Sequence, residues 1–348
     1  MDEKCELVFQ KIFYQHRLDY FKAIEKIIKE KNDRTVCSLQ VLPCRKLFST
    51  LGRYSVVFSI YNIYNERKEF ENNIQAIVKV TDSREDEFMT EKLNNNFINA
   101  IVQANISPHF VLNFDYRICK DMCTFLSNNK SNYDSMYINW SHVKKGYCVL
   151  SFQEMFHGDV FSDIFTFEHN VILSLIIQVI MGCMALHHKN VEHNDLHLGN
   201  VFYKHLLNGE NTYFSYKIGE DVYLVKHCKF LFVIGDYGRL KDNTFMIRPD
   251  KNYIDDLSLF INELKKKLNH RDNRYDGLLD ILIEKIEELK KNEKKSTYYL
   301  ISEIFQNIIQ YCGQTDDYLI MKDIFKKNEL KGNVQVNKIK FDIDNNLY

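Results

Sequence analysis

The chain contains few glycines and prolines, which form turns, and no cysteine pair of the kind that binds metal. Its 348 residues include 12 glycines and 3 prolines, which excludes collagen-like repeats and Pro- or Gly-rich low-complexity classes. Its nine cysteines form no CxxC pair, so we expect reduced, separately buried thiols. Neither charge sign is in excess, because 46 Lys and Arg face 47 Asp and Glu. We therefore expect no nucleic acid partner.

Long hydrophobic runs are also absent. The most apolar stretch, 171–186, contains Ser174 and Gln178 and is shorter than the roughly 20 residues that a membrane span needs. We expect a buried helix there and no membrane span. The start, MDEKCELVFQ, lacks a basic region followed by an apolar core, so an intracellular location is expected.

The composition is that of a globular protein, with 45% hydrophobic and 27% charged residues, and the length suits about two domains. Helical periodicity is expected at 1–32, 170–188, 254–268, 276–291 and 298–312. Strand signals lie at 46–80, 110–119, 146–152, 201–203, 213–218, 222–225 and 230–234. Strands dominate the first half and helices the second, which favours an α+β fold with two lobes over a parallel doubly wound sheet.

A further helix of about 20 residues is expected after the Ser-x-x-acid capping box of Ser83–Asp86. Its apolar face should carry Met89, Leu93, Phe97 and Ile101. The polar run 127–135 is expected to be an exposed loop, and the tail 332–348 could add an edge strand.

The strongest chemical signal is HNDLHLGN at 193–200, directly after the apolar helix. Asp195 is followed five positions later by Asn200, on a loop between a helix and a strand. Such a carboxylate can deprotonate a hydroxyl, and the amide oxygen can hold a metal ion, as phosphoryl transfer requires. Alone, the segment could be an ordinary polar turn.

Three weaker signals accompany the loop. Asp236 precedes an aromatic and a glycine after an apolar strand, where it could bind Mg²⁺ or simply form a turn. Lys79 lies inside an apolar strand, where it could meet a phosphate or carboxylate, or extend to solvent at an edge. The segment 50–57 around Gly52 could cover phosphates or be a plain hairpin.

In the order Gly52, Lys79, Asp195 with Asn200, and Asp236, these pieces resemble the protein kinase superfamily from about Phe48 to Leu268. The resemblance implies a two-lobed fold, with a small N-lobe of antiparallel sheet and one helix and a larger helical C-lobe. It implies an N-terminal helical extension at 1–45, a kinase-like domain at 46–330 (N-lobe 46–153, C-lobe 157–330) and a tail at 331–348.

The resemblance also implies the site residues. Asp195 would be the catalytic base, Lys79 would hold the α- and β-phosphates, and Asn200 with Asp236 would bind Mg²⁺. The remaining ATP contacts would come from Gly52, Tyr54, Val57, Glu91, Glu154 and Phe156, with Gln153 as gatekeeper. His193 would pack beneath the loop against Tyr237, and Asp256 could supply the C-lobe anchor of that loop.

Two details resemble haspin-like kinases and kinase-like proteins of large DNA viruses. His197 stands where most protein kinases have lysine, and the interval from Asp195 to Asp236 is lengthened by a hairpin-like insertion. With the Asn-rich composition, this implies a viral serine/threonine kinase.

The chain departs from the family pattern elsewhere. Thr50 and Ser55 replace two loop glycines, Asn194 replaces the arginine that pairs with a phosphorylated activation loop, and no Ala-Pro-Glu signature follows Gly238. The acidic partner of Lys79 is open among Glu85, Glu87 and Glu91, with Glu87 or Glu91 preferred.

The function expected is ATP- and Mg²⁺-dependent phosphoryl transfer to Ser/Thr hydroxyls of a protein substrate. The alternatives are a pseudokinase or ATP-binding scaffold, motivated by the degraded glycine loop, and a small-molecule kinase of aminoglycoside or choline type, in which an Asp-Leu-His-x-Gly-Asn loop also occurs. The sequence does not predict the oligomeric state.

Overall fold

The structure is a computed structural model that forms two compact units. It describes Arg17, Leu18, Lys22 and residues 44–48, 55–61, 75–82, 84–130, 139–206, 212–218, 221–226, 228–242, 253–269, 275–291, 307–308, 320–322 and 337–342. Unit 1 comprises Met1–Lys11, Ala100–Phe110 and Phe156–Tyr348; unit 2 comprises Ile12–Asn99 and Val111–Met155. Helices are combined with mainly antiparallel sheets, which confirms the α+β class.

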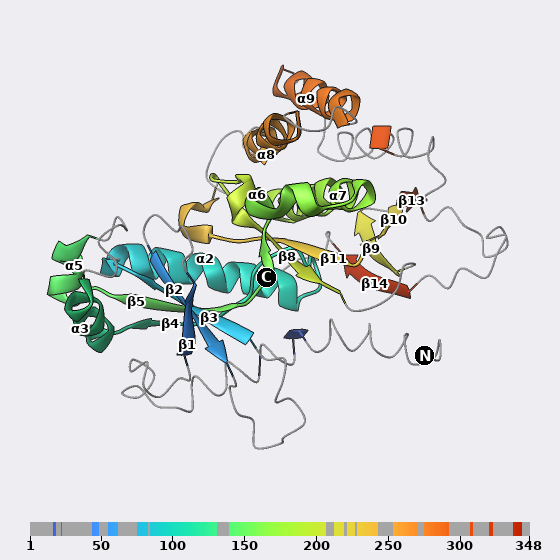
Figure 1. Ribbon diagram of the computed structural model, residues 1–348. Coiled ribbons are helices and arrows are strands. Elements are labelled where there is room, and N and C mark those ends of the chain that lie inside the picture. Colours follow the sequence, from blue (N-terminus) through green and yellow to red (C-terminus); the bar gives the residue numbers. More distant parts are fainter. Residues whose placement is uncertain are drawn as a thin grey trace. The chain divides into compact units, whose positions relative to one another are not determined.

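Unit 2 is built on a five-stranded antiparallel sheet in the order β1-β2-β3-β5-β4 (Figure 1). The strands are β1 (Cys44–Phe48), β2 (Ser55–Tyr61), β3 (Gln75–Thr81), β4 (Asn113–Ile118) and β5 (Val149–Glu154). They confirm the strands expected in this part of the sequence. Because side chains alternate along a strand, Val78 and Val80 are buried on one face, while Lys79 lies half-buried on the other.

Helix α2 (Glu85–Gln103) confirms the helix expected after the capping box. At its start the backbone N–H of Arg84 donates to the Glu87 carboxylate at 3.0 Å, whereas the side chain of Ser83 lies outside the described residues. The expected apolar face is wrong for Met89 and Leu93, which are 47% and 64% exposed, and is confirmed for Ile101, which is buried. The buried positions are Phe88, Asn95, Ile98, Asn99, Ile101 and Val102.

The buried face of α2 differs from the predicted one because two of its residues are asparagines, each hydrogen-bonded to a specific partner. Asn99 donates to the carbonyl of Asn113 at 2.6 Å and accepts the Asn113 N–H at 3.0 Å. Asn95 donates to the hydroxyl of Tyr116. Hydrogen bonds offset the cost of burying such amides. The spacing of apolar residues alone therefore did not predict which face of α2 is buried.

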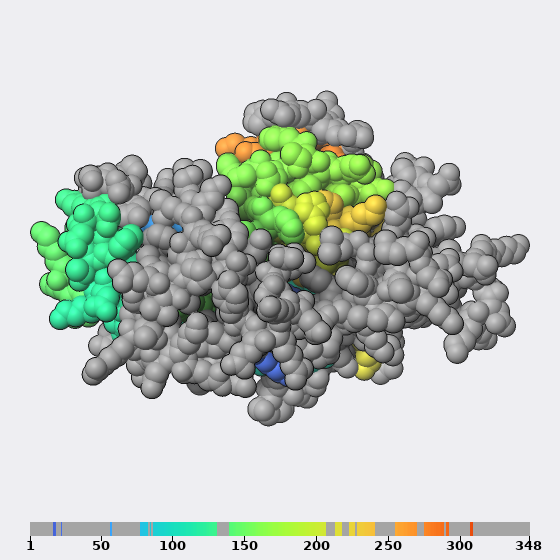
Figure 2. All heavy atoms as spheres, turned by 60° about the horizontal axis from the view of Figure 1, so that its bottom comes forward, coloured from blue at the N-terminus to red at the C-terminus, as the bar shows by residue number. Residues whose placement is uncertain are grey.

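Two short helices of unit 2, α3 (Lys120–Asn128) and α5 (Trp140–Lys145), were not predicted. They lie beside each other at the surface (Figure 2). A disulfide joins Cys123 on α3 to Cys148, with the Cα atoms 5.4 Å apart. The expectation of reduced cysteines is therefore wrong for this pair, whereas Cys183 and Cys228 are free thiols. Disulfides are uncommon in the reducing compartments of the cell. The disulfide therefore does not support the expected intracellular location, which stays a prediction.

Unit 1 contains three long helices and a three-stranded sheet in the order β11-β8-β6 (Figure 1). The helices with eight or more described residues are α7 (His169–His188), α8 (Tyr253–Leu268) and α9 (Asp276–Lys291). The shorter elements are β6 (Gly158–Asp159), α6 (Val160–Asp163), η2 (Ile164–Thr166), β7 (Val191–Glu192), η3 (Leu198–Asn200), β8 (Val201–His205), β11 (Phe230–Ile234), η4 (Tyr237–Arg239) and β12 (Lys241–Asp242). These confirm the expected helices at 170–188, 254–268 and 276–291.

The hairpin expected before Asp236 is also present. Strands β9 (Thr212–Ile218) and β10 (Asp221–Lys226) pair antiparallel within a second sheet, in the order β13-β10-β9-β14. Its outer strands are β13 (Ile320–Lys322) and β14 (Asn337–Asp342). Strand β14 pairs in parallel with β9, which confirms an edge strand in the tail.

Helix α7 is the central helix of unit 1. It is long and apolar enough to cross a membrane by length and composition, but 94% of its most apolar window is buried inside the protein. Gln178 is fully buried within it and binds β11 through Phe230 and Phe232. The core helix of a soluble protein has the same properties, and the expected lack of a membrane span stays a prediction.

Candidate functional site

The pairing of β8 with β11 brings the two halves of the expected site together in unit 1. Val201, the first residue of β8, lies opposite Ile234, the last residue of β11. Asn200 precedes β8, and Asp236 follows β11. The two residues therefore lie at the same end of the two-stranded ribbon that β8 and β11 form. The N–H of Gly235 donates to the carbonyl of Asn200 at 2.9 Å, so backbone pairing continues up to these two residues.

Helix α8 fixes the loop 193–200 from below. The carboxylate of Asp256 accepts the backbone N–H groups of His193 and Asn194 at 2.7 and 2.8 Å. Two turns further along, Glu263 accepts the N–H of Leu198 at 2.6 Å. The anchoring role expected for Asp256 agrees with this geometry. Glu263 was not predicted from the sequence, although its spacing of seven residues from Asp256 places both on one face of the helix.

Burial dominates the electrostatics of this anchor. Asp256 is 5% exposed, and desolvation raises the pKa of its carboxyl to about 7, although the two N–H donors act in the opposite direction. The neighbouring carboxylates of Glu192 and Asp255 raise this pKa further. The loop is thus held by a group that changes charge near neutral pH.

Two site residues adopt left-handed backbone conformations. Asn194 has φ of 62° and Asp236 has φ of 63°, a region that costs energy for residues other than glycine but that Asn and Asp tolerate best. Such strain tends to collect at functional sites, where surrounding contacts hold it in place. Here the holding contacts are those of Asp256 to the loop and those of Tyr237 beside Asp236.

His193 and Tyr237 form the buried support beneath the loop, as expected for both. Their rings lie 6.0 Å apart in an edge-to-face arrangement, and both side chains are almost fully buried. His193 Nε2 is 2.9 Å from the carbonyl oxygen of Gly235, and the Tyr237 hydroxyl donates to the carbonyl of Ile234. Desolvation lowers the pKa of His193, which suits a structural role better than proton transfer.

The expected catalytic base lies at the open side of the loop. The side chain of Asp195 is 29% exposed, and its Oδ1 accepts a hydrogen bond from the guanidinium of Arg239 at 3.1 Å. The side-chain amide of Asn200 donates to the carbonyl of Asp195 at 2.9 Å. Sequence analysis did not identify Arg239, because it lies just outside the Asp-Tyr-Gly motif that drew attention to this region.

The donor set at the end of the ribbon fits Mg²⁺. Because Asn200 uses its amide nitrogen on Asp195, its oxygen is directed elsewhere, and Asp236 supplies an exposed carboxylate. Oxygen ligands from one or two side chains, completed by water and phosphate, are typical of Mg²⁺ in phosphoryl transfer. Gly238 leaves room here, because only Asp236 Oδ1, at 3.9 Å, would lie within 4 Å of an added Cβ.

The part of the chain that the structure describes contains no cluster of three or more His, Cys, Asp or Glu side chains arranged to hold a metal ion. A site made of one amide, one carboxylate and a bound nucleotide would not form such a cluster. The Mg²⁺ site therefore stays a prediction.

In unit 2, one face of the sheet collects the nucleotide residues expected there. Val57 and Lys79 lie opposite each other on β2 and β3, and Lys79 lies opposite Ser151 on β5. Ile77 and Gln153 are also paired, so alternation places all five side chains on one face. Gly52 and Tyr54 lie outside the described residues.

A buried polar network extends along this face. Gln153 donates to the Ser151 hydroxyl at 2.7 Å, and Ser151 donates to Asn113 Oδ1 at 3.3 Å. The Tyr116 hydroxyl lies 3.2 Å from the same oxygen. Because Asn95 of α2 donates to Tyr116, the network links the helix to the strand opposite Lys79.

The same helix carries the residues predicted as the acidic partner of Lys79. Glu87 is half-exposed and binds Arg84 through both its backbone N–H and its guanidinium, so its carboxylate is already engaged at the start of α2. The side chain of Glu85 lies outside the described residues. Glu87 and Glu91 both stay predicted partners of Lys79.

Glu154 differs from the expectation that it faces a nucleotide. It lies opposite Ala76, so its side chain points away from the face that carries Lys79. There it forms a bidentate ion pair with Arg17 at 2.9–3.0 Å, and both side chains are 1% exposed. Any contact of Glu154 with adenine would have to use its backbone. Arg17 was not identified from the sequence.

Phe156 belongs to unit 1, where it is half-buried. Its ring centre is 6.2 Å from that of Phe202 on β8, and the ammonium of Lys204 lies 5.7 Å from the ring centre. Phe202 follows Asn200 by two residues, so this aromatic pair lies next to the expected metal site in the chain.

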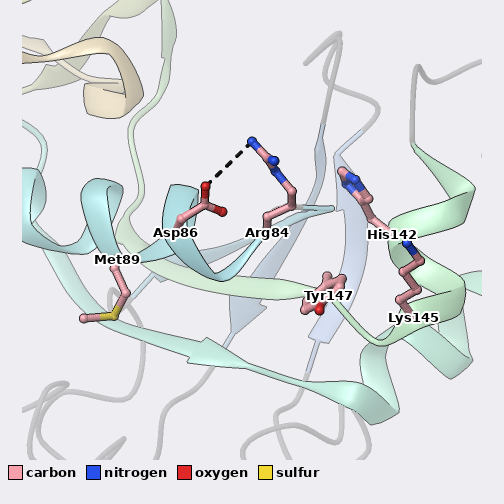
Figure 3. A pocket seen from close by; sticks show the side chains of 6 residues that line it. All are labelled: Arg84, Asp86, Met89, His142, Lys145 and Tyr147. Carbon is pink, nitrogen blue, oxygen red and sulfur yellow. Dashed lines mark ion pairs between the residues drawn. The ribbon is translucent and has the colours of Figure 1, made fainter.

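A separate cavity of about 550 Å³ lies in unit 2. Figure 3 shows it between the start of α2, which provides Arg84, Asp86 and Met89, and the segment that carries His142, Lys145 and Tyr147. Arg84 and Asp86 form an ion pair of 3.7 Å there. None of the residues expected to bind ATP or Mg²⁺ lines this cavity, so we assign it no part in the candidate site.

Comparison with known proteins gives no independent assignment, because no protein-family model and no curated protein matches this chain significantly. The functional argument therefore rests on the residues and their geometry.

Proposed function

We propose that this chain is an ATP- and Mg²⁺-dependent serine/threonine protein kinase with a two-lobed kinase-like fold. In this proposal residues 46–153 form the N-lobe and 157–330 the C-lobe. The proposal includes the viral origin and intracellular location expected from the sequence.

The observation that carries the proposal is the anchored loop of unit 1. Asp195 faces solvent from a loop held by Asp256 through two backbone hydrogen bonds. Backbone pairing of the adjacent ribbon brings Asn200 beside Gly235, the residue before Asp236. This arrangement supports the proposal, because the residues that would serve as base and metal ligands come from segments whose backbones are paired beside one another.

Asp195 would orient the acceptor hydroxyl and take its proton. Lys79 would bind the α- and β-phosphates from the sheet face that also carries Val57, and Gly52 with Tyr54 would cover them. Glu91 would orient Lys79, while the backbone of Glu154 and the ring of Phe156 would contact adenine. Positioning and charge neutralisation supply most of the acceleration in such reactions.

Asn200 and Asp236 would hold Mg²⁺, which neutralises charge on the phosphates when it is bound. The loop contacts of Asp256 and Glu263 would keep Asp195 and Asn200 in register with Asp236.

The test is transfer of labelled γ-phosphate by the purified full chain in the presence of Mg²⁺. Casein, histone and the chain itself serve as protein acceptors; an aminoglycoside and choline serve as small-molecule acceptors. We expect transfer to proteins by the wild type and loss of at least about 100-fold in Asp195→Asn and Lys79→Met. Circular dichroism of each variant separates loss of chemistry from loss of folding.

The rival functions give different results in the same assay. Transfer to a sugar or amino alcohol without transfer to protein would favour the small-molecule kinase. Nucleotide binding by a folded wild type without any transfer would favour the pseudokinase. Neither alternative is favoured by a specific contact in the described residues.

A further inference from the structure

The loop 193–200, which carries Asp195, contains no lysine or arginine. His197 occupies the position where the resembled family has lysine, and its Nδ1 accepts the backbone N–H of Gly199 at 3.1 Å. His197 therefore caps the turn η3 through Nδ1, and this ring nitrogen is already engaged within the loop. A phosphoryl group transferred at Asp195 would need positive charge from another residue.

Arg239 provides that charge from the neighbouring segment. Its guanidinium donates to Asp195 Oδ1 at 3.1 Å, while its side chain stays 65% exposed. An exposed ion pair of this kind contributes little to stability, so folding alone gives little reason for it. The ion pair places a guanidinium beside Asp195, so a hydroxyl group that approaches Asp195 also approaches Arg239.

The backbone beneath Arg239 is fixed. Tyr237, two residues earlier, is 2% exposed, binds the carbonyl of Ile234 and packs its ring 6.4 Å from that of Phe110. The next residue, Leu240, donates its N–H back to the Tyr237 carbonyl at 3.2 Å. The short helix η4 therefore presents the arginine from a rigid base.

We propose that Arg239 is a catalytic residue that contacts the transferred phosphoryl group and supplies positive charge to it. This inference rests on the proposed function. The acceptor oxygen forms a bond to the γ-phosphorus as its proton passes to Asp195. The bond from that phosphorus to the β–γ bridging oxygen breaks, and ADP leaves with the electron pair. Arg239 exchanges its bond to Asp195 for the phosphoryl oxygens, and no oxidation or reduction occurs.

The test compares Arg239→Ala, Arg239→Lys and wild type in the phosphate-transfer assay. We expect kcat to fall by about 100-fold in Arg239→Ala, the scale of losing one donor to transition-state charge. Arg239→Lys should retain more, and KM for ATP should change less than about threefold. Arg84→Ala is the matched control, because Arg84 is also exposed and paired with a carboxylate.

Two rescue measurements distinguish chemistry from structure. Added guanidinium should restore part of the activity of Arg239→Ala, and His197→Lys in the same chain should restore part of it by returning a cation to the loop. A merely structural role for Arg239 would respond to neither. Activity of Arg239→Ala within twofold of wild type would overturn the inference. Activity above that of wild type would also overturn it, because the ion pair between Arg239 and Asp195 would then inhibit the reaction.

Nucleotide binding separates failure of this inference from failure of the proposed function. If the wild type transfers phosphate and Asp195→Asn does not, but Arg239→Ala equals wild type, only the inference fails. If the wild type binds nucleotide but transfers nothing, the proposed function fails. Arg239→Ala should then weaken binding of MgATP, within the same threefold limit, more than binding of MgADP, and equal weakening overturns the inference. If the wild type binds neither nucleotide, both proposals are overturned.

Discussion

Removal of Arg17 should destabilise unit 2 far more than removal of a surface arginine. Arg17 and Glu154 are 1% exposed and joined by three hydrogen-bond contacts of 2.9–3.0 Å. Arg17→Met leaves the Glu154 carboxylate buried without the cation that offsets its desolvation. Breaking a buried pair in this way costs about 3–5 kcal/mol, against at most about 1 kcal/mol for Arg84→Met, whose side chain is 56% exposed.

The chain offers its own probe for this measurement. Its single tryptophan, Trp140, lies on α5 of unit 2, so its fluorescence reports urea unfolding of that unit. The double variant Arg17→Met/Glu154→Met should recover most of the loss, because it removes both buried charges. The reasoning is refuted if Arg17→Met costs no more than Arg84→Met, or if the double variant is as unstable as the single one.

Three further outcomes follow from the described contacts. Because the folded pKa of Asp256 is about 7 against 3.8 for an ordinary aspartate, the folded state holds a proton that the unfolded state releases. The contribution of Asp256 to stability should therefore fall by a few kcal/mol as pH rises from about 4 to 7, so the wild type should lose stability relative to Asp256→Asn over this range. Urea titrations in which the two proteins show the same pH dependence would contradict this. Reduction of the disulfide between Cys123 and Cys148, 25 positions apart, should cost about 3 kcal/mol by the loop-entropy estimate, and an unchanged urea midpoint for Trp140 fluorescence would argue against it. An added Cβ at Gly182 would lie 2.9 Å from Ile234 Cδ1, so Gly182→Ala should cost about 1–3 kcal/mol; circular dichroism melts should show partial recovery with Ile234→Val, and no recovery would refute the proposed clash.

The elements of the fold were predictable where one periodicity dominates. Helix α7 and strands β3 and β11 have strong apolar patterns, and the structure contains them close to the expected bounds. The buried face of α2 was not predictable from apolar spacing, because Asn95 and Asn99 are buried by pairing with side-chain and backbone groups of β4.

The candidate site shows the same division. Asp195, Asn200 and Asp236 were predicted because their residue types and spacing suit phosphoryl transfer, and Asp256 was predicted from the family resemblance. Partners brought together only by tertiary structure leave no such pattern in the sequence. Arg17 lies 137 positions from Glu154, and Arg239 lies 44 positions from Asp195.

The most direct test of the account is a single-turnover measurement of γ-phosphate transfer from MgATP by wild type and Asp195→Asn, with ATP affinity measured in parallel. Asp195 is assigned the acceptor proton and no contact with ATP. The account therefore predicts rapid transfer by wild type, loss of at least about 100-fold in the variant, and ATP affinities that agree within about threefold. Equal transfer rates in the two proteins, or no transfer by a folded wild type that binds ATP, would contradict it.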